Sequence, residues 1–138
     1  MSYLVDTNVL SEARKGARAN AGVVTWFAEV ADHELYVSVL TVGELRRGID
    51  SIERRDASAA RALDGWLRGM VDGFRERVLP VDRAIAEEWG RMNVAQSLPV
   101  IDTLLAATAK IHGLTLVTRN TKDVARTGIR CLDPFRDR

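Results

Sequence analysis

Short apolar runs alternate along the chain with longer stretches in which apolar residues recur every three or four positions. The short runs are rich in Leu, Val and other apolar or β-branched residues, and several end at polar or turn-forming residues. This is the pattern expected of strands buried inside a parallel sheet. The runs predict strands at residues 3–5, 35–39, 77–80, 115–118 and 129–132, the last of them at an edge of the sheet.

The longer stretches predict helices with one apolar face. Asn8 is expected to cap the first helix, which continues to about Gly16. Thr41 and Glu44 have the spacing of a capping box and predict the start of the third helix. The segment 101–111 is apolar nearly all round, so this helix is expected to be central and buried. The remaining helices are predicted around residues 23–30, 63–74, 85–92 and 120–126.

The alternation of strands and helices predicts the fold class. Strand–helix–strand units connect by right-handed crossovers and place helices on both faces of the sheet. We therefore expect an α/β protein with three α/β/α layers and a mainly parallel sheet of four to five strands. No repeat, low-complexity segment or linker interrupts the pattern, so residues 1–138 are expected to form a single domain.

Composition narrows the chemistry. The net charge of +1 provides no overall basic field, so any nucleic-acid contact must come from a local arrangement of charge. One cysteine, Cys131, and two histidines argue against a disulfide and against a Cys- or His-rich zinc site. The N-terminus has no secretory pattern and no apolar run approaches the ~20 residues that span a bilayer. A reducing, cytoplasmic location without membrane contact is expected.

Acidic residues follow three of the predicted strands, where open α/β sheets place their ligands. Asp6 comes directly after the first strand, Glu44 a few residues past the second, and Asp123 a few past the fourth. Asp102 is the only charged residue between Val94 and Lys110, in the most apolar helix. Converging carboxylates repel one another unless a cation is present, and all-oxygen sites suit Mg²⁺ or Mn²⁺. Such sites bind phosphate oxygens and activate water.

Each acidic residue also has an ordinary structural explanation. Glu44 would serve only the capping box, and Asp123 and Asp102 would be acids at helix N-termini, where negative charge is favourable. Asp6 would be an Asx-turn residue. Taken singly each residue is a weak indication, whereas all four together favour a metal site.

Four segments carry a resemblance to a known family. They read YLVDTNVLSE at 3–12, SVLTVGELRRG at 38–48, IDTLLAATA at 101–109 and VTRNTKD at 117–123. In order and spacing they resemble the PIN domain, and specifically the VapC-type toxin ribonucleases of bacterial toxin–antitoxin pairs, in the branch that includes FitB-like proteins. The resemblance covers nearly the whole chain, and the combination of four segments is highly specific.

The resemblance implies a PIN-like five-stranded parallel sheet and Mg²⁺- or Mn²⁺-dependent endoribonuclease activity that hydrolyses RNA phosphodiester bonds. It also implies a homodimer, a small VapB-type antitoxin that blocks the acidic pocket, and promoter DNA bound only through that antitoxin. By position, Asp6 and Asp102 are the metal ligands, Glu44 is a ligand or orients the attacking water, and Asp123 completes the catalytic set. Substrate contacts are expected at Thr7, Asn8, Ser11, Thr118, Arg119 and Asn120.

Several charged and aromatic residues have two interpretations each. Arg119 either contacts phosphate or is a solvated surface residue, and Arg14, Lys15 and Arg18 either line an RNA track or form a solvated face. Aromatic residues at helical spacing are usually core, the alternative being a dimer contact or a groove for an antitoxin helix. These aromatic residues are Trp26, Phe27, Trp66 and Trp89.

Three other functions compete with the toxin interpretation. One is a PIN-type nuclease that processes RNA without an antitoxin. Another is a phosphate-signalling or phosphatase domain with an acidic pocket, although Asp6-Thr7-Asn8 lacks the second acid of an Asp-x-Asp pair. The third is a non-catalytic regulatory subunit, against which the intact acidic set argues. No Gly-rich phosphate loop is present, so nucleotide hydrolysis is not expected.

Overall fold

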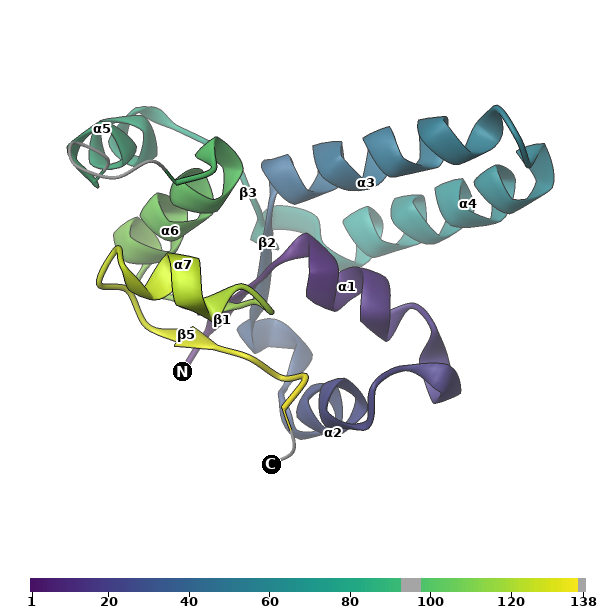
Figure 1. Cartoon of the computed structure of the whole chain (residues 1–138), viewed down its shortest axis with the longest axis horizontal. Helices are drawn as coiled ribbons and strands as arrows, with labels where there is room; N and C mark the ends of the chain where they lie inside the picture. The colour runs from purple at the N-terminus through teal and green to yellow at the C-terminus, as the bar shows by residue number, and fades with distance from the viewer. Residues whose placement is uncertain (93–97, 137–138) are drawn as a thin grey trace.

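The computed structural model describes residues 1–92 and 98–136. Five strands form one parallel sheet in the order β3-β2-β1-β4-β5, with helices on both faces (Figure 1). The predicted three-layer α/β/α class is thereby confirmed, and the fifth strand lies at an edge as expected. The elements are β1 (Tyr3–Val5), α1 (Thr7–Ala13), η1 (Gly16–Arg18), α2 (Ala21–Glu29), η2 (Asp32–Glu34), β2 (Leu35–Ser38), α3 (Val39–Glu53), α4 (Ala57–Phe74), η3 (Arg75–Arg77), β3 (Val78–Leu79), α5 (Arg83–Met92), α6 (Val100–His112), β4 (Thr115–Val117), α7 (Thr121–Ala125) and β5 (Cys131–Leu132).

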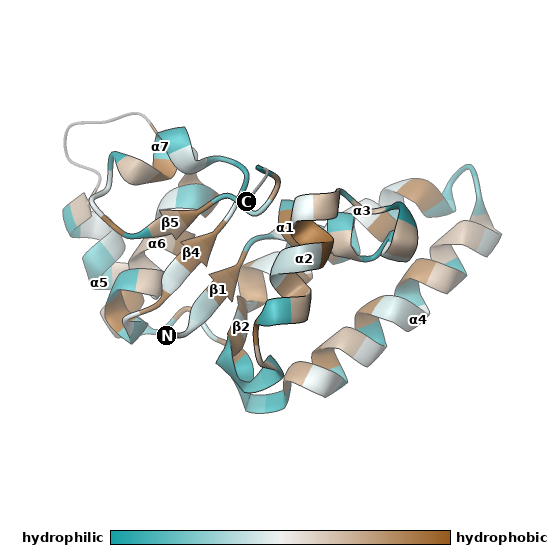
Figure 2. Ribbon diagram, turned by 90° about the horizontal axis from the view of Figure 1, so that it is seen from below, coloured by the Kyte–Doolittle hydropathy of each residue, from teal (hydrophilic) through white to brown (hydrophobic). Residues whose placement is uncertain are grey.

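The two central strands supply both halves of the core. Because neighbouring side chains of a strand point to opposite faces, Val5 and Val117 pack in the half that α1 to α4 cover, and Leu4 and Leu116 in the half that α6 and α7 cover. All four are inaccessible to solvent. Figure 2 shows these apolar strands between the helical layers. The strand ends are therefore rigidly placed, and so are the residues that follow them.

The α6 helix is buried in its middle, as predicted from its apolar composition. Thr103 and residues 105–109 are buried, whereas Val100 and Ile111 at its two ends are exposed. The α5 helix packs against it, and α3 and α4 form an antiparallel pair that extends away from the sheet (Figure 1). Asp102 lies in the first turn of α6, where it is half-buried.

Two predicted helix caps were wrong. Asp6, not Asn8, caps α1, since its side chain accepts the Thr7 N–H and Asn8 lies within the helix. Ser38 caps α3, because its hydroxyl accepts the Leu40 N–H. Thr41 is buried without a hydrogen-bond partner for its hydroxyl, so the capping box of Thr41 and Glu44 does not form. In both places an extended residue with a short polar side chain, directly after β1 or at the end of β2, starts the helix without a loop.

Other boundaries moved by a few residues. The first helix ends at Ala13 rather than near Gly16, and α4 begins at Ala57, six residues before the predicted start, with Asp56 as its cap. Such shifts are expected where caps rather than apolar periodicity decide the ends. Within residues 1–92 and 98–136, no helix combines the length and the apolar character that crossing a membrane requires.

Candidate active site

Asp6 lies at the point where the strand order of the sheet reverses. From β1 the chain continues to β2 and β3 on one side, whereas β4 and β5 lie on the other side. Parallel sheets bind their ligands in the crevice beyond the strand ends at such a switch point. Asp6 directly follows β1 and Thr118 directly follows β4, so both flank this crevice.

Hydrogen bonds hold the Asp6 carboxylate in one orientation. Its Oδ1 accepts the Thr7 N–H at 2.7 Å, and its Oδ2 accepts the Thr118 hydroxyl at 2.8 Å and the Asn8 amide at 3.4 Å. The Asp6 N–H donates to the Val117 carbonyl at 2.9 Å. With only 6% of the residue exposed, Asp6 is a buried carboxylate in a preformed polar cradle.

Asp6 and Asp102 are held in surroundings that oppose their ionisation. Burial raises the pKa of Asp6; hydrogen bonds from Thr118 and Thr7 partly counteract this, and the charge of Glu44 adds to it. Burial also raises the pKa of Asp102, and the charges of Asp6, Glu44 and Asp123 raise it further. No cation of the described chain counters either shift. The four predicted acidic residues are therefore close enough to interact electrostatically, and a bound cation would offset the repulsion between their carboxylates.

The carboxylates come from four separate helices. Asp6 caps α1, Glu44 lies exposed on α3, Asp102 is in the first turn of α6, and Asp123 is exposed in the first turn of α7. Glu44 Oε1 accepts the hydroxyl of Thr7, which links α3 to the end of β1.

This donor set fits Mg²⁺ or Mn²⁺. In residues 1–92 and 98–136 no three acidic, His or Cys side chains lie close enough to enclose an ion by themselves. Mg²⁺ usually keeps several waters and takes only one or two carboxylates from the protein. An open, all-oxygen site with Asp6 and Asp102 as the deepest donors meets that requirement.

Three residues predicted to contact substrate are engaged inside the site. Thr118 is fully buried; its hydroxyl donates to Asp6 and accepts the Asn120 N–H at 3.1 Å. Asn8 donates to Asp6 and accepts the Arg119 N–H, and Thr7 donates to Glu44. Their visible role is to hold carboxylates in place, and their contact with substrate stays a prediction. Asn120 is exposed next to them, and its side chain makes no cap hydrogen bond to α7.

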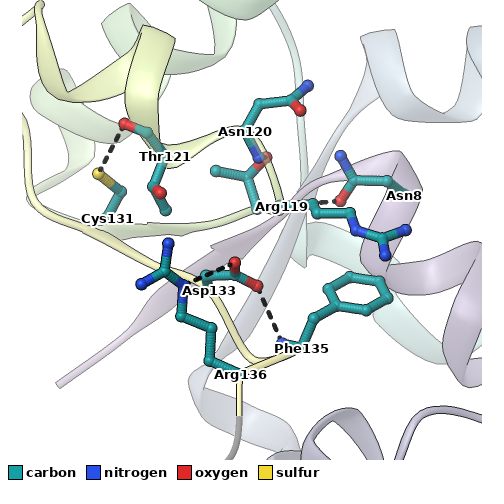
Figure 3. A network of polar contacts seen from close by, with 9 residues as sticks. Asn8, Arg119, Asn120, Thr121, Cys131, Asp133, Phe135 and Arg136 are labelled. Carbon is teal, nitrogen blue, oxygen red and sulfur yellow. Dashed lines mark hydrogen bonds and ion pairs between the residues drawn. The ribbon is translucent and has the colours of Figure 1, made fainter.

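A contact from the C-terminal segment positions Arg119. Its guanidinium lies over the Phe135 ring, 4.3 Å from the ring centre, as Figure 3 shows. Asp133 accepts the Phe135 N–H at 2.9 Å and pairs with Arg136 at 3.5 Å, which fixes this segment. Arg119 is therefore an exposed cation held beside Asn8 rather than a freely solvated one. The sequence offered no indication of Phe135, because the contact joins residues after different strands.

Two adjoining hollows lie on the side of the sheet that α1, α3 and α4 cover, and only the first reaches a carboxylate of the site. The first, here called the site cleft, has a volume of about 180 Å³ between α1, α3 and α4 and includes Thr7, Glu44 and Gly48 in its lining. The second, the apolar groove, has a volume of about 350 Å³ and is lined by Leu10, Ala13, Arg14, Phe27, Asp32, Leu35, Trp66, Met70, Gly73, Phe74 and Arg77. Arg14 and Trp66 line both hollows, so the two adjoin.

The aromatic residues divide between core and surface. Trp26 is 1% exposed and is core, as predicted for most of them. Phe27 and Trp66 line the apolar groove. Trp89 is half-buried and donates to the Thr103 hydroxyl at 3.0 Å, next to Asp102.

Comparison with known proteins gives consistent matches over nearly the full length. The family described as PIN domain matches residues 3–129. The plasmid stability protein StbB of Pseudomonas syringae pv. tomato is 34% identical, over 96% of this chain and 97% of that protein. Toxin FitB of Neisseria gonorrhoeae is 29% identical over 97% and 99%, and VapC ribonuclease Y4jK of Sinorhizobium fredii is 30% identical over 96% of each.

Solved structures show the same similarity. FitAcB from Neisseria gonorrhoeae superposes with a TM-score of 0.88 at 29% identity, covering 96% of this chain and 98% of that chain. FitAB bound to an IR36 DNA fragment also gives a TM-score of 0.88, at 26% identity, covering 99% of this chain and 97% of that chain.

Proposed function

Because the chain belongs to the PIN domain family, we propose that it is the toxin of a bacterial toxin–antitoxin pair and acts as a metal-dependent endoribonuclease. The observation that carries the proposal is the buried Asp6 carboxylate, which shares its field with three further acidic residues and has no cation of the described chain beside it. Relatives of nearly equal length are named a toxin and a ribonuclease. A phosphate-signalling domain is disfavoured by the same matches.

Each residue of the proposed active site has a separate role. Asp6 and Asp102 would hold Mg²⁺ or Mn²⁺, and Thr118 keeps Asp6 oriented through its hydroxyl. A bound cation would offset negative charge on the phosphodiester and make water a stronger nucleophile. Glu44 uses Oε1 to accept from Thr7, which leaves Oε2 to orient the attacking water. Arg119, held over Phe135, places a positive charge where a flanking phosphate would lie.

The apolar groove is suited to an amphipathic helix of the antitoxin. Its lining is mainly apolar and aromatic, and the exposed Arg14 offers positive charge to an acidic residue of a partner. We expect a basic residue of the partner to reach the acidic pocket, pair with carboxylates there and exclude the cation. Promoter DNA is then contacted only through the antitoxin, in the cytoplasm where the RNA substrate is found. The toxin itself is expected to be a homodimer, which sedimentation measures directly.

Purified protein tests the nuclease proposal. Cleavage of RNA is expected with Mg²⁺ or Mn²⁺ and not in excess chelator. Asp72→Asn changes an exposed acid of α4 that lies outside the acidic pocket. This variant is expected to cut RNA like the parent, and it is the control for the loss of one negative charge in Asp6→Asn. Full cleavage in chelator would contradict the mechanism.

Co-expression tests the toxin proposal separately. Together with the small reading frame adjacent to its gene, the protein is expected to form a stable complex that no longer cleaves RNA or arrests growth. If the two products elute separately and growth arrest persists, an RNA-processing nuclease without an antitoxin becomes the better description.

A further inference from the structure

The site cleft opens directly beside Glu44 and combines two kinds of surface. Leu45 and Ile49 of α3 are buried, and Ile52, Leu63 and Trp66 are half-buried, so that side of the lining is apolar. The polar part of the lining comes from Thr7, Ser11, Arg14 and Glu44. A small cavity with an apolar lining and a few polar groups is typical of a site for a small organic group.

Several donors in the lining have no partner in the part of the chain that the structure describes. The Ser11 hydroxyl, the Arg14 guanidinium and the Trp66 indole N–H make no hydrogen bond to described residues. Thr7 and Glu44, by contrast, are bonded to each other. The cleft therefore offers hydrogen-bond donors, one aromatic ring and one planar cation within a single small volume.

We propose that the site cleft binds one base of single-stranded RNA, that of a nucleotide flanking the bond that is cut. This inference rests on the proposed ribonuclease function and deepens it. Bases splayed out of single-stranded RNA stack on aromatic rings and arginine planes and present acceptors to donors, which Trp66, Arg14 and Ser11 supply. The cleft reaches Glu44, so a base held there would lie beside the carboxylate that we propose orients the attacking water.

The shared lining connects base binding to inhibition. Arg14 and Trp66 belong both to the site cleft and to the apolar groove. An antitoxin helix in the apolar groove engages these two residues and so competes with the base as well as with the cation. Inhibition then has two components, of which only one depends on the carboxylates.

Gly48 provides a way to close the cleft. It lies in the lining, and a Cβ added there meets no heavy atom within 4 Å. Because a Cβ is tolerated there, Gly48→Leu is expected to place a bulky side chain that favours helix into the lining of the cleft. Gly65 of α4 is equally open and exposed but lies outside both hollows, so Gly65→Leu is the matched control.

The experiment uses the full chain with Mg²⁺ and a randomised single-stranded RNA library whose cut ends are sequenced. The parent and Gly65→Leu are expected to prefer particular bases at one position next to the cut. Gly48→Leu is expected to lose that preference and about tenfold or more of kcat/KM. A defined substrate with an abasic nucleotide at that position is expected to slow the parent by about the same factor and to slow Gly48→Leu no further, because both changes remove one interaction.

Four outcomes overturn the inference. The first is that the losses from Gly48→Leu and the abasic nucleotide multiply. The second is that Gly48→Leu cuts with the parent's rate and preference. The third is that it weakens only antitoxin binding, which would assign the cleft to the antitoxin. The fourth is that the folded parent cuts no RNA with metal, which overturns the proposed function together with this inference.

Circular dichroism checks that Gly48→Leu folds. If it does not, Arg14→Gln takes its place, since Arg14 is exposed and its guanidinium makes no hydrogen bond or ion pair with described residues. The same non-multiplying loss with the abasic substrate is then expected, and multiplying losses again overturn the inference.

Discussion

Two buried carboxylates lie in opposite surroundings. Asp6, 6% exposed at the end of β1, has hydroxyl, amide and N–H donors but no cation, and burial raises its pKa. Glu88 on α5 is 8% exposed, accepts from Lys110 at 2.9 Å and pairs with Arg91 at 3.6 Å. The Lys110 hydrogen bond, together with both positive charges, lowers the pKa of Glu88.

Glu88 connects two helices of the fold, whereas Asp6 is a ligand of the proposed cation. Lys110 belongs to α6, so the Glu88 pair joins α5 to the helix that carries Asp102. Trp89 adds a hydrogen bond to Thr103 in the same pair of helices. The charge of Glu88 is balanced by Lys110 and Arg91, so removing Glu88 leaves Lys110 without its partner, whereas no cation of the described chain balances Asp6.

The largest expected difference is between variants that remove the charge of each carboxylate in turn. Asp6→Asn is expected to lower RNA cleavage by about a hundredfold or more, because the deepest oxygen donor for the cation is lost. Glu88→Gln is expected to keep cleavage at temperatures well below its melting point while melting earlier than the parent. Cleavage rates and thermal melts of both variants decide this. Loss of activity in Glu88→Gln with full activity in Asp6→Asn would reverse the assignment.

The cation should stabilise the protein through the pocket alone. Mg²⁺ at a hundredfold excess over its Kd is expected to stabilise the parent by about 2.7 kcal/mol, from the linkage of binding to folding. Asp102→Asn is expected to gain much less, and in chelator to melt at the parent's temperature or higher, because carboxylate repulsion is relieved. Thermal melts with and without Mg²⁺ measure both effects. If Asp102→Asn is destabilised and the parent does not respond to Mg²⁺, the acidic pocket does not bind the cation.

Thr118 provides a test of how Asp6 is held. Thr118→Val removes the hydroxyl that donates to Asp6 Oδ2, and such outer contacts of a ligand typically contribute ~10–100-fold in metal affinity. Thr115→Val is the matched control at the other end of β4, because the Thr115 hydroxyl is buried without a partner. Titration of Mn²⁺ into both variants reports the affinities. Equal affinities would show that Asp6 is oriented by its other donors.

The smallest expected effect is in the pH dependence of stability. The folded-state pKa of Glu88 is lowered, so its ion pairs stabilise the protein fully above the unfolded value of about 4.3 and lose their effect as the pH falls through the folded value. The stability difference between the parent and Glu88→Gln should therefore be largest near neutral pH and disappear in acid. Glu87→Gln removes an exposed acid that pairs with Arg83 and serves as the control for the loss of one charge on α5. Denaturant unfolding from pH 3 to 7 measures the stability differences.

Much of the site could be predicted from the residues. Asp6, Glu44, Asp102 and Asp123 follow strands or interrupt an apolar helix, and the structure brings all four into one field. The role of Thr118 could not be predicted from the sequence. Thr118 was expected to contact substrate, but it is fully buried and donates to Asp6. Its hydrogen bond joins positions 112 residues apart, and no local pattern encodes such a contact.

By itself, the sequence determined the alternation of strands and helices, the α/β class and the four acidic positions. These follow from periodicity and from residue type after each strand, which are local properties. Only the tertiary structure decided that Asp6 and Ser38 are caps, that Glu88 is balanced by Lys110, and that α1, α3 and α4 leave the site cleft open. The physical reason is that burial and electrostatic balance depend on which distant side chains pack together, and apolar periodicity leaves that choice open.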